Sequence, residues 1–319
     1  MVALYVTSSE AGNGKTTICA GLGKHLLDDG KKVGYFKPIT DEGNANSDAE
    51  FMKNLLNLEG PANAISPIIS GNKVKEAYDK ISKDKDIVII EASHEWNKAS
   101  EEIVKSLNAK IIAIESYSKD LSKVMNNYKD SGKSLVGIII NKVPKNLLER
   151  VQDEIAAQSN TNVLGIIPED RTLFALTMGE LTLYIQGEIL KGADKSDELV
   201  ENIMAGAMIV DTGPDYFGIK DNKAVIIKSD RPDMQMAAME TSTTCLILTG
   251  DTDPIELVLN RADEKDIPII TTKNSITDVA ADIEGALNKT RFCQDNKLPR
   301  LDEILTQNLD FKTVYKALA

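Results

Sequence analysis

Three cysteines are too few and too scattered to build a disulfide framework or a metal site in this chain of 319 residues. Cys19, Cys245 and Cys293 stand far apart and lack the paired spacing of zinc ligands. Scattered thiols of this kind are typical of a reducing compartment, where disulfides are rare. We therefore expect a cytoplasmic protein whose cysteines are buried or inert.

Long apolar runs and an excess of basic residues are also missing. No stretch of about 18 or more apolar residues occurs, so the sequence predicts no membrane-spanning helix. The chain begins directly with a strand pattern and has no basic start or cleavage site, so we expect no secretory signal. The formal net charge is −12, which argues against general binding to nucleic acid.

What the sequence does contain is a phosphate-loop pattern at its start. The apolar run 2–6 leads into a polar loop that closes on Gly14, Lys15 and Thr16, and a helical pattern begins at once. Strand, loop, Gly-Lys-Thr and helix together are the context that a phosphate-binding loop requires. Consecutive backbone N–H groups of such a loop bind anionic oxygen atoms. The residues expected to contact a nucleotide are Glu10, Ala11, Gly12, Asn13, Gly14, Lys15, Thr16 and Thr17.

This loop departs from the usual pattern G-x-x-x-x-G-K-[ST] at its first position, where Ser9 replaces glycine. The lysine that marks the deviant form of the loop is also absent, because Glu10 stands five residues before Lys15. We expect Lys15 to place a cation on the outer phosphates and the Thr16 hydroxyl to reach Mg²⁺.

Short apolar runs alternate with helical stretches along the first half of the chain. This rhythm predicts an α/β fold of the P-loop NTPase type, a parallel sheet with helices on both faces. The expected strands are 2–6, 31–36, 86–91, 111–114, 135–140 and 163–167. Ligands of such sheets bind beyond the carboxyl ends of the strands. The residues expected at these ends are Lys37, Glu91, Ser116 and Asn141.

The same rhythm resumes in a smaller unit beyond residue 170. The expected strands are 205–210, 224–227, 245–248 and 267–270, and the expected helices are 176–186, 232–239, 254–262 and 276–287. We predict a P-loop domain over 1–170, a second α/β domain over 171–290 and a helical tail over 291–319. This tail packs back on a domain or on a partner chain.

Polar residues near the expected strand ends complete the candidate site. Glu91 ends its strand where a Mg·nucleotide site needs a carboxylate. It is either a metal ligand or a group that orients water, or else an ordinary surface glutamate at a strand end. Asp48 either binds the metal or only caps its helix. Lys37 is a candidate for stabilising phosphate charge in a transfer step. Asn141 either contacts a purine edge or caps a helix, and His94 is either a substrate or proton-transfer group or a solvated loop residue.

These motifs together resemble those of dethiobiotin synthetases. The resemblance lies in the loop ending at Thr16, in the strand ending at Glu91, and in residues 35–38, 46–49, 141–143 and 164–168. It implies ATP and Mg²⁺ as ligands, with Lys15 and Lys37 on phosphate and Asn141 on the base. It also implies that Thr16, Asp48 and Glu91 hold the Mg²⁺. The glycine-rich G-A-G-G segment that helps form the synthetase active site is replaced here by residues 92–95.

The second half of the chain is similar to DRTGG domains in residues 168–173, 200–208, 229–233 and 248–250. A synthetase-like domain followed by a DRTGG domain resembles the N-terminal region of long phosphate acetyltransferases. Asp251 replaces the last glycine of the motif. Too few residues follow position 290 to hold the transferase catalytic domain, so we do not expect acetyltransferase activity.

Three functions are compatible with these observations. The first is a regulatory protein that binds ATP and Mg²⁺, senses a nucleotide or metabolite level and forms a homodimer through its DRTGG domain. The second is an ATP-dependent ligase or carboxylase that acts on a small carboxylate or amine, with Lys15 and Lys37 as catalytic groups. A scaffold with a vestigial nucleotide site is a third alternative, which Ser9 favours. None of the three needs a membrane or a nucleic-acid partner.

Overall fold

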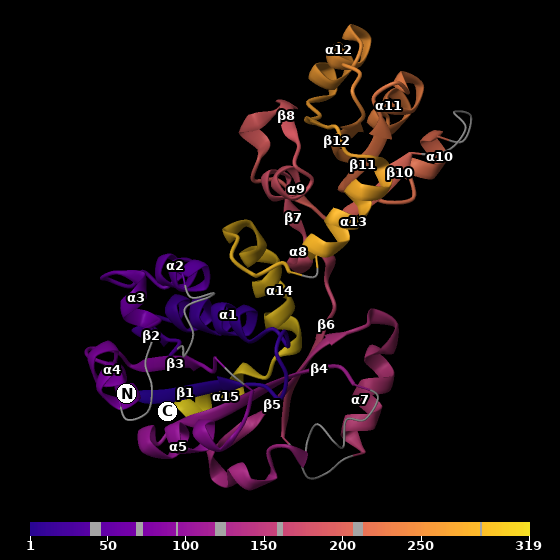
Figure 1. Cartoon of the computed structure of the whole chain (residues 1–319). Coiled ribbons are helices and arrows are strands. Elements are labelled where there is room, and N and C mark those ends of the chain that lie inside the picture. The colour runs from indigo at the N-terminus through magenta and orange to yellow at the C-terminus, as the bar shows by residue number, and fades with distance from the viewer. Residues whose placement is uncertain are drawn as a thin grey trace. The chain divides into compact units, whose positions relative to one another are not determined.

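The computed structural model describes residues 1–38, 46–67, 73–93, 95–118, 126–157, 162–206, 213–287 and 289–319. The chain divides into two compact units (Figure 1). The first comprises Met1–Asp170 and Phe292–Ala319, and the second comprises Arg171–Arg291. Among the residues described, no helix combines the length and the apolar character needed to cross a bilayer. All three cysteines are free, and Cys19 and Cys245 are buried.

A six-stranded sheet forms the centre of the first unit, and all its strand pairs are parallel. In spatial order the strands are β2 (Val33–Phe36), β3 (Ile87–Glu91), β1 (Val2–Thr7), β4 (Lys110–Ser116), β5 (Leu135–Val143) and β6 (Val163–Pro168). Most of their side chains are apolar and buried, as in parallel sheets that helices cover on both faces. The predicted parallel α/β sheet is confirmed.

Helices cover both faces of this first sheet. They are α1 (Lys15–Asp28), α2 (Asn46–Leu55), α3 (Ala62–Ile65), α4 (Lys73–Ile81), α5 (Lys98–Leu107) and α7 (Leu148–Ala156), with 3-10 turns at Lys129–Ser134 and Lys145–Leu147. On one face, Tyr78 of α4 and Val104 of α5 pack with Tyr5 of β1 in a single buried cluster. α1 contacts β1, β2 and β3 and packs beside α2.

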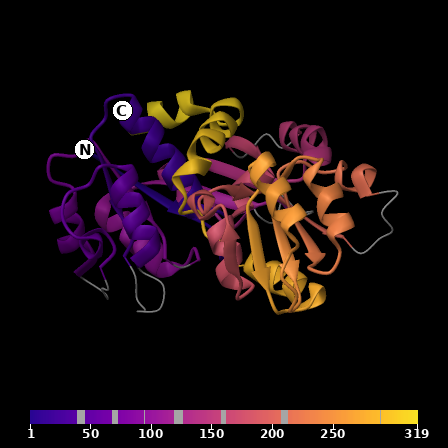
Figure 2. The same ribbon diagram turned by 90° about the horizontal axis from the view of Figure 1, so that it is seen from above.

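The last two helices, α14 (Leu298–Asn308) and α15 (Phe311–Leu318), complete the first unit after a 3-10 turn at Asp295–Lys297. Figures 1 and 2 both show these helices, in yellow, beside the indigo α1. Leu305 of α14 is buried against α1 so closely that a Cβ on Gly21 would collide with it. Leu309 forms a single antiparallel bridge with Gly165 of β6. The C-terminal segment therefore packs on its own P-loop unit.

A five-stranded sheet forms the second unit. In spatial order its strands are β10 (Asn202–Gly206), β11 (Lys223–Lys228), β12 (Thr243–Thr249), β13 (Ile269–Thr272) and β8 (Glu188–Lys191). The first four are parallel, whereas β8 is antiparallel to β13. The expected strand 205–210 begins earlier, at Asn202, and its residues 207–210 lie outside the described part of the chain.

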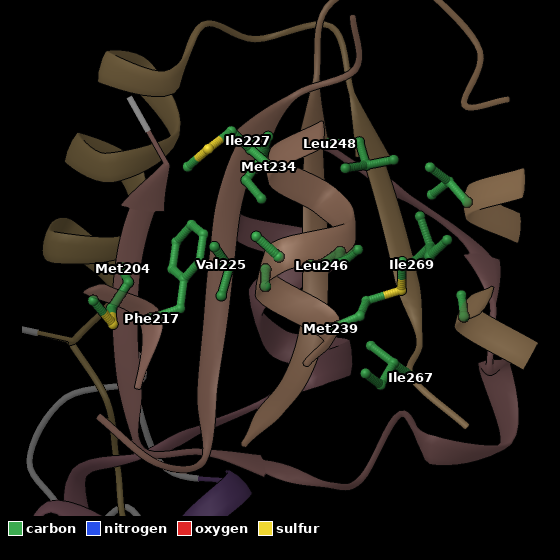
Figure 3. Close-up of a cluster of buried hydrophobic side chains, with 14 residues drawn as sticks. Met204, Phe217, Val225, Ile227, Met234, Met239, Leu246, Leu248, Ile267 and Ile269 are labelled. Carbon is green, nitrogen blue, oxygen red and sulfur yellow. The ribbon is translucent and has the colours of Figure 1, made fainter. Parts of the chain in front are cut away.

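Helices cover both faces of the second sheet as well. α10 (Gly213–Phe217), α11 (Pro232–Met239) and α12 (Glu256–Lys265) lie on one face, and α9 (Met178–Tyr184) and α13 (Ile276–Leu287) lie on the other. Figure 3 shows Phe217 and Met234 of two of these helices packed over Val225 and Leu246 of the sheet. The unit also contains α8 (Arg171–Phe174), a 3-10 turn at Ala193–Lys195, and the short antiparallel pair β7 (Leu176–Thr177) and β9 (Leu199–Val200).

Replacing Leu305 by alanine tests whether the C-terminal helices belong to the core of the first unit. We expect Leu305→Ala to lower the free energy of unfolding of this unit by about 3 kcal/mol, because a buried leucine leaves a cavity. Urea unfolding followed by the fluorescence of Trp96, the single tryptophan, reports on the first unit alone. Lys312→Ala, at an exposed position in α15, should change the free energy of unfolding by less than about 0.5 kcal/mol. Equal effects of the two substitutions would contradict the packing described.

Candidate functional site

The carboxyl end of β1 runs into a loop that leads directly into α1. Gly12 and Gly14 of this loop have φ values of 75° and 93°, in the left-handed region that costs glycine least. Gly14 also has no room for a side chain, because a Cβ there would collide with Asn141 Nδ2. No side chain caps the N-terminus of α1 at Gly14. The first backbone N–H groups of such a helix have no partner within the helix and can bind an anion.

Lys15 lies at the point where this loop meets the helix. Its Nζ donates a hydrogen bond to Ser8 Oγ at 2.8 Å, so the ammonium sits against the start of the loop. Burial lowers the pKa of Lys15, while the nearby carboxylate of Glu91 acts in the opposite direction. A phosphate bound beside this ammonium would favour its charged form and would itself be stabilised.

Glu91, the last residue of β3, is 1% exposed, and in the described part of the chain Thr16, Tyr35 and Lys37 donate to it. Its Oε1 accepts a hydrogen bond from Thr16 Oγ1 at 2.7 Å and lies 2.7 Å from Lys37 Nζ. Its Oε2 accepts a hydrogen bond from Tyr35 OH at 2.8 Å. The same Lys37 Nζ lies 2.8 Å from Asp48 Oδ2. Donors from α1, from β2 and from the residue after β2 therefore converge on one carboxylate, and Lys37 links this carboxylate to Asp48 of α2.

The charge of Lys37 is fixed by its surroundings. Burial acts to lower the pKa of Lys37, but the carboxylates of Glu91 and Asp48 outweigh it and hold the pKa above its ordinary value. The lysine is therefore an ammonium at neutral pH. It bridges two carboxylates, which shows that Glu91 and Asp48 lie close enough to share one cation.

This donor set fits Mg²⁺ as part of a nucleotide complex. Thr16, Asp48 and Glu91 offer oxygen atoms, the ligands that Mg²⁺ prefers. The described residues contain no group of three or more His, Cys, Asp or Glu side chains that could hold a metal by themselves. Proteins usually bind Mg²⁺ through one or two carboxylates together with phosphate oxygens. The two carboxylates here match that pattern.

On the other side of β1, residues at the ends of β4 and β5 hold the same loop. Asn141 of β5 is 8% exposed, and its Nδ2 donates a hydrogen bond to Asn13 O at 2.9 Å. Ser116 Oγ of β4 donates to Asn13 Oδ1 at 2.8 Å. Glu115, one residue earlier in β4, accepts hydrogen bonds from Ser9 and Asn13. The contact of Asn141 with a base stays a prediction, since the contact seen is with the loop.

The structure gathers the residues that the sequence singled out into one edge of the first sheet. Lys15, Thr16, Lys37, Asp48 and Glu91 lie together on the β3 side of the loop, and Asn141 lies on its β5 side. The remaining predicted contact residues belong to the loop and the first helical turn, namely Glu10, Ala11, Gly12, Asn13, Gly14 and Thr17.

Three further residues bear on the site. His94 lies outside the described residues. Tyr35 and Glu115 belong to the site although the sequence interpretation did not select them. Glu115 carries a signal that sequence reasoning could have used, because it is a glutamate at the end of a buried apolar strand, as Glu91 is.

Comparison with known proteins assigns each unit to a family model. A model described as an AAA domain matches residues 2–176, and the DRTGG domain model matches residues 180–286. Phosphate acetyltransferase from Synechocystis sp. is 24% identical over 295 residues, which cover 79% of this chain and 42% of that protein. The chain spans about half the length of the phosphate acetyltransferases it matches, 42% to 51%.

Two further proteins resemble the first unit. The ATP-dependent dethiobiotin synthetase BioD from Methanococcus vannielii is 25% identical over 217 residues, which cover 56% of this chain and 99% of the synthetase. The septum site-determining protein MinD from Pyrococcus horikoshii, solved in complex with Mg-ADP, is 18% identical with a TM-score of 0.40. That match covers 54% of this chain and 83% of MinD.

Removing the shared cation should destabilise the first unit. We expect Lys37→Met to lower its free energy of unfolding by about 3 kcal/mol, because two buried carboxylates lose their counter-ion. Lys24→Met removes an exposed ion pair with Asp28 and should cost less than about 0.5 kcal/mol. Urea unfolding followed by Trp96 fluorescence measures both. A loss for Lys37→Met no larger than for Lys24→Met would show that the two carboxylates do not depend on this lysine.

Proposed function

The chain belongs to the AAA domain family through residues 2–176, and we propose that it binds ATP together with Mg²⁺ at the carboxyl edge of its first sheet. The observation that carries this proposal is the convergence of Lys15, Thr16, Lys37, Asp48 and Glu91 at the N-terminus of α1. Cationic side chains, helix N–H groups and a pair of carboxylates at one point match what a magnesium-bound polyphosphate requires.

Each residue has a distinct role in this proposal. The backbone N–H groups of the loop and the ammonium of Lys15 bind the phosphate chain. Thr16, Asp48 and Glu91 hold the Mg²⁺, which neutralises phosphate charge when it is bound. Lys37 lies beside the two carboxylates and contacts an outer phosphate. Asn141 contacts the base through the part of its side chain that does not donate to Asn13.

We propose that this binding serves regulation, so that the first unit senses a nucleotide or metabolite level and the DRTGG unit forms a homodimer. The proposal concerns the nucleotide-binding unit and the DRTGG unit, which are the parts that this chain shares with the phosphate acetyltransferases it matches. Leu183, Tyr184 and Leu190 of the second unit are exposed by 80%, 42% and 48%. Apolar side chains on α9 and on the edge strand β8 support a contact with a second copy of the chain.

Lys37 favours a second candidate function, an ATP-dependent ligase or carboxylase that acts on a small carboxylate or amine. Its ammonium lies 2.7 Å from Glu91 Oε1 and 2.8 Å from Asp48 Oδ2, and in this function it would stabilise the charge that develops during phosphoryl transfer. The same lysine is the counter-ion of these two carboxylates, so the ligase function adds a catalytic role to a structural one.

Calorimetric titration with ATP and Mg²⁺ tests nucleotide binding. We expect the wild-type protein to release or absorb measurable heat and Lys15→Met to bind about 10- to 100-fold more weakly, because hydrogen bonds to charged groups contribute about 1.5–3 kcal/mol. Lys24→Met, which changes an exposed lysine of the same helix, should bind as the wild type does. Absence of both heat and thermal shift with wild-type protein would refute the proposal.

Turnover measurements separate regulation from catalysis. If the protein is regulatory, the wild type and the Lys37→Ala variant hydrolyse ATP at the same rate, and added small carboxylates or amines do not raise that rate. If it is a ligase, one of these compounds stimulates ATP turnover, and Lys37→Ala lowers the stimulated rate by about 100-fold or more, as the loss of a charge-stabilising group does. Stimulated turnover that Lys37→Ala leaves unchanged would exclude the catalytic role of this lysine.

A further inference from the structure

Glu115 is a buried carboxylate beside the phosphate loop for which ATP binding alone gives no role. It lies at the end of β4, next to β1 in the sheet, and is 2% exposed. A buried carboxylate is costly unless hydrogen bonds satisfy its oxygen atoms. The donors that satisfy Glu115 therefore indicate what the side chain is for.

Among the described residues, three of the four donors to Glu115 come from the phosphate loop. Oε1 accepts from the backbone N–H of Ser9 at 2.7 Å, and Oε2 accepts from Ser9 Oγ at 2.7 Å and from Asn13 Nδ2 at 3.0 Å. The fourth donor is the hydroxyl of Tyr128, which donates to Oε1. Each oxygen thus accepts two hydrogen bonds, and the loop is tied to β4 at both of its ends.

The two tied residues bracket the first part of the segment that an anion would contact, and Gly14, Lys15 and Thr16 follow directly after Asn13. Ser9 and Asn13 stand on either side of residues 10–12, which are exposed. Asn13 is held at three further points, because its Nδ2 also donates to Ile114 O at 3.4 Å, Ser116 Oγ donates to its side chain and Asn141 Nδ2 donates to its backbone oxygen. A loop fixed in this way loses little conformational freedom when a phosphate binds, so more of the contact energy appears as affinity.

We propose that Glu115 is a positioning residue that holds the phosphate loop in its anion-binding conformation, with Ser9 as its partner at the position where the usual loop has glycine. The inference rests on the proposed binding of ATP. The carboxylate does not contact the nucleotide and acts through Ser9 and Asn13. Its oxygen atoms already accept hydrogen bonds from the loop and from Tyr128.

Glu115→Gln tests this role, because a glutamine has one oxygen and leaves two of the four donors without an acceptor. We expect the Kd for ATP with Mg²⁺ to rise about 10- to 100-fold, the cost of unsatisfied buried donors. Backbone N–H groups of residues 9–14 should exchange with deuterium faster in the nucleotide-free variant. Glu102→Gln, on the exposed surface of α5, should match the wild type in both measurements.

Tyr128→Phe distinguishes positioning from general stability. It removes the one donor to Glu115 that lies outside the loop, so it should lower the free energy of unfolding while leaving the Kd within about twofold of the wild type. Ser9→Gly should weaken binding severalfold, and it should cost less in the Glu115→Gln background than alone, since the two residues act as a pair.

These outcomes separate the two proposals. Failure of the wild-type protein to bind ATP would refute the proposed function. Binding by the wild type that Glu115→Gln leaves within twofold, with unchanged exchange in the loop, would overturn only the role of Glu115. If Glu115→Gln fails to fold, Ser9→Gly decides, because unchanged affinity and exchange in that variant would equally overturn the role. A Kd raised as much by Tyr128→Phe as by Ser9→Gly would also overturn it.

Discussion

The rest of the candidate site depends on the hydrogen bonds and the ion pair that the buried carboxylate of Glu91 makes. It is buried at the end of β3, and it accepts hydrogen bonds from Tyr35 and Thr16 while pairing with Lys37. A buried negative charge is tolerated only when such partners surround it. Thr16, Tyr35 and Lys37 are therefore all positioned by Glu91, which fixes the first turn of α1 and the end of β2 relative to each other. Lys37 in turn brings in Asp48 from α2.

Because β1 lies between β3 and β4 in the sheet, a second buried glutamate can hold the loop from the side opposite Glu91. β1 carries the loop and lies between β3 and β4, and each of these neighbours has a buried glutamate at its carboxyl end. Glu91 holds the helix side of the loop through Thr16, and Glu115 holds its start and its end through Ser9 and Asn13. Two carboxylates that do not touch each other thus set the geometry of one anion-binding loop, each from its own strand.

Sequence reasoning found the parts of this arrangement that periodicity and motif spacing encode. The parallel sheet follows from apolar runs separated by helices, and Glu91 follows from its place at the end of such a run. Glu115 was missed because the apolar run ends at Ile114, so that only Ser116 was assigned to the edge, whereas the strand continues through both. β8 was missed because its four residues alternate between exposed and half-buried positions at an edge, without an apolar run. The place of the C-terminal helices depends on packing against Gly21, which no local pattern reveals.

The central claim is that the loop after β1 receives the phosphate chain of a nucleotide, and a crystal structure of the protein with ATP and Mg²⁺ tests it most directly. The account predicts a triphosphate on the backbone N–H groups of the loop and the first turn of α1, with Lys15 on its outer phosphates and a metal ion beside Thr16. A nucleotide bound elsewhere, with this loop unchanged and no phosphate near Lys15, would contradict it.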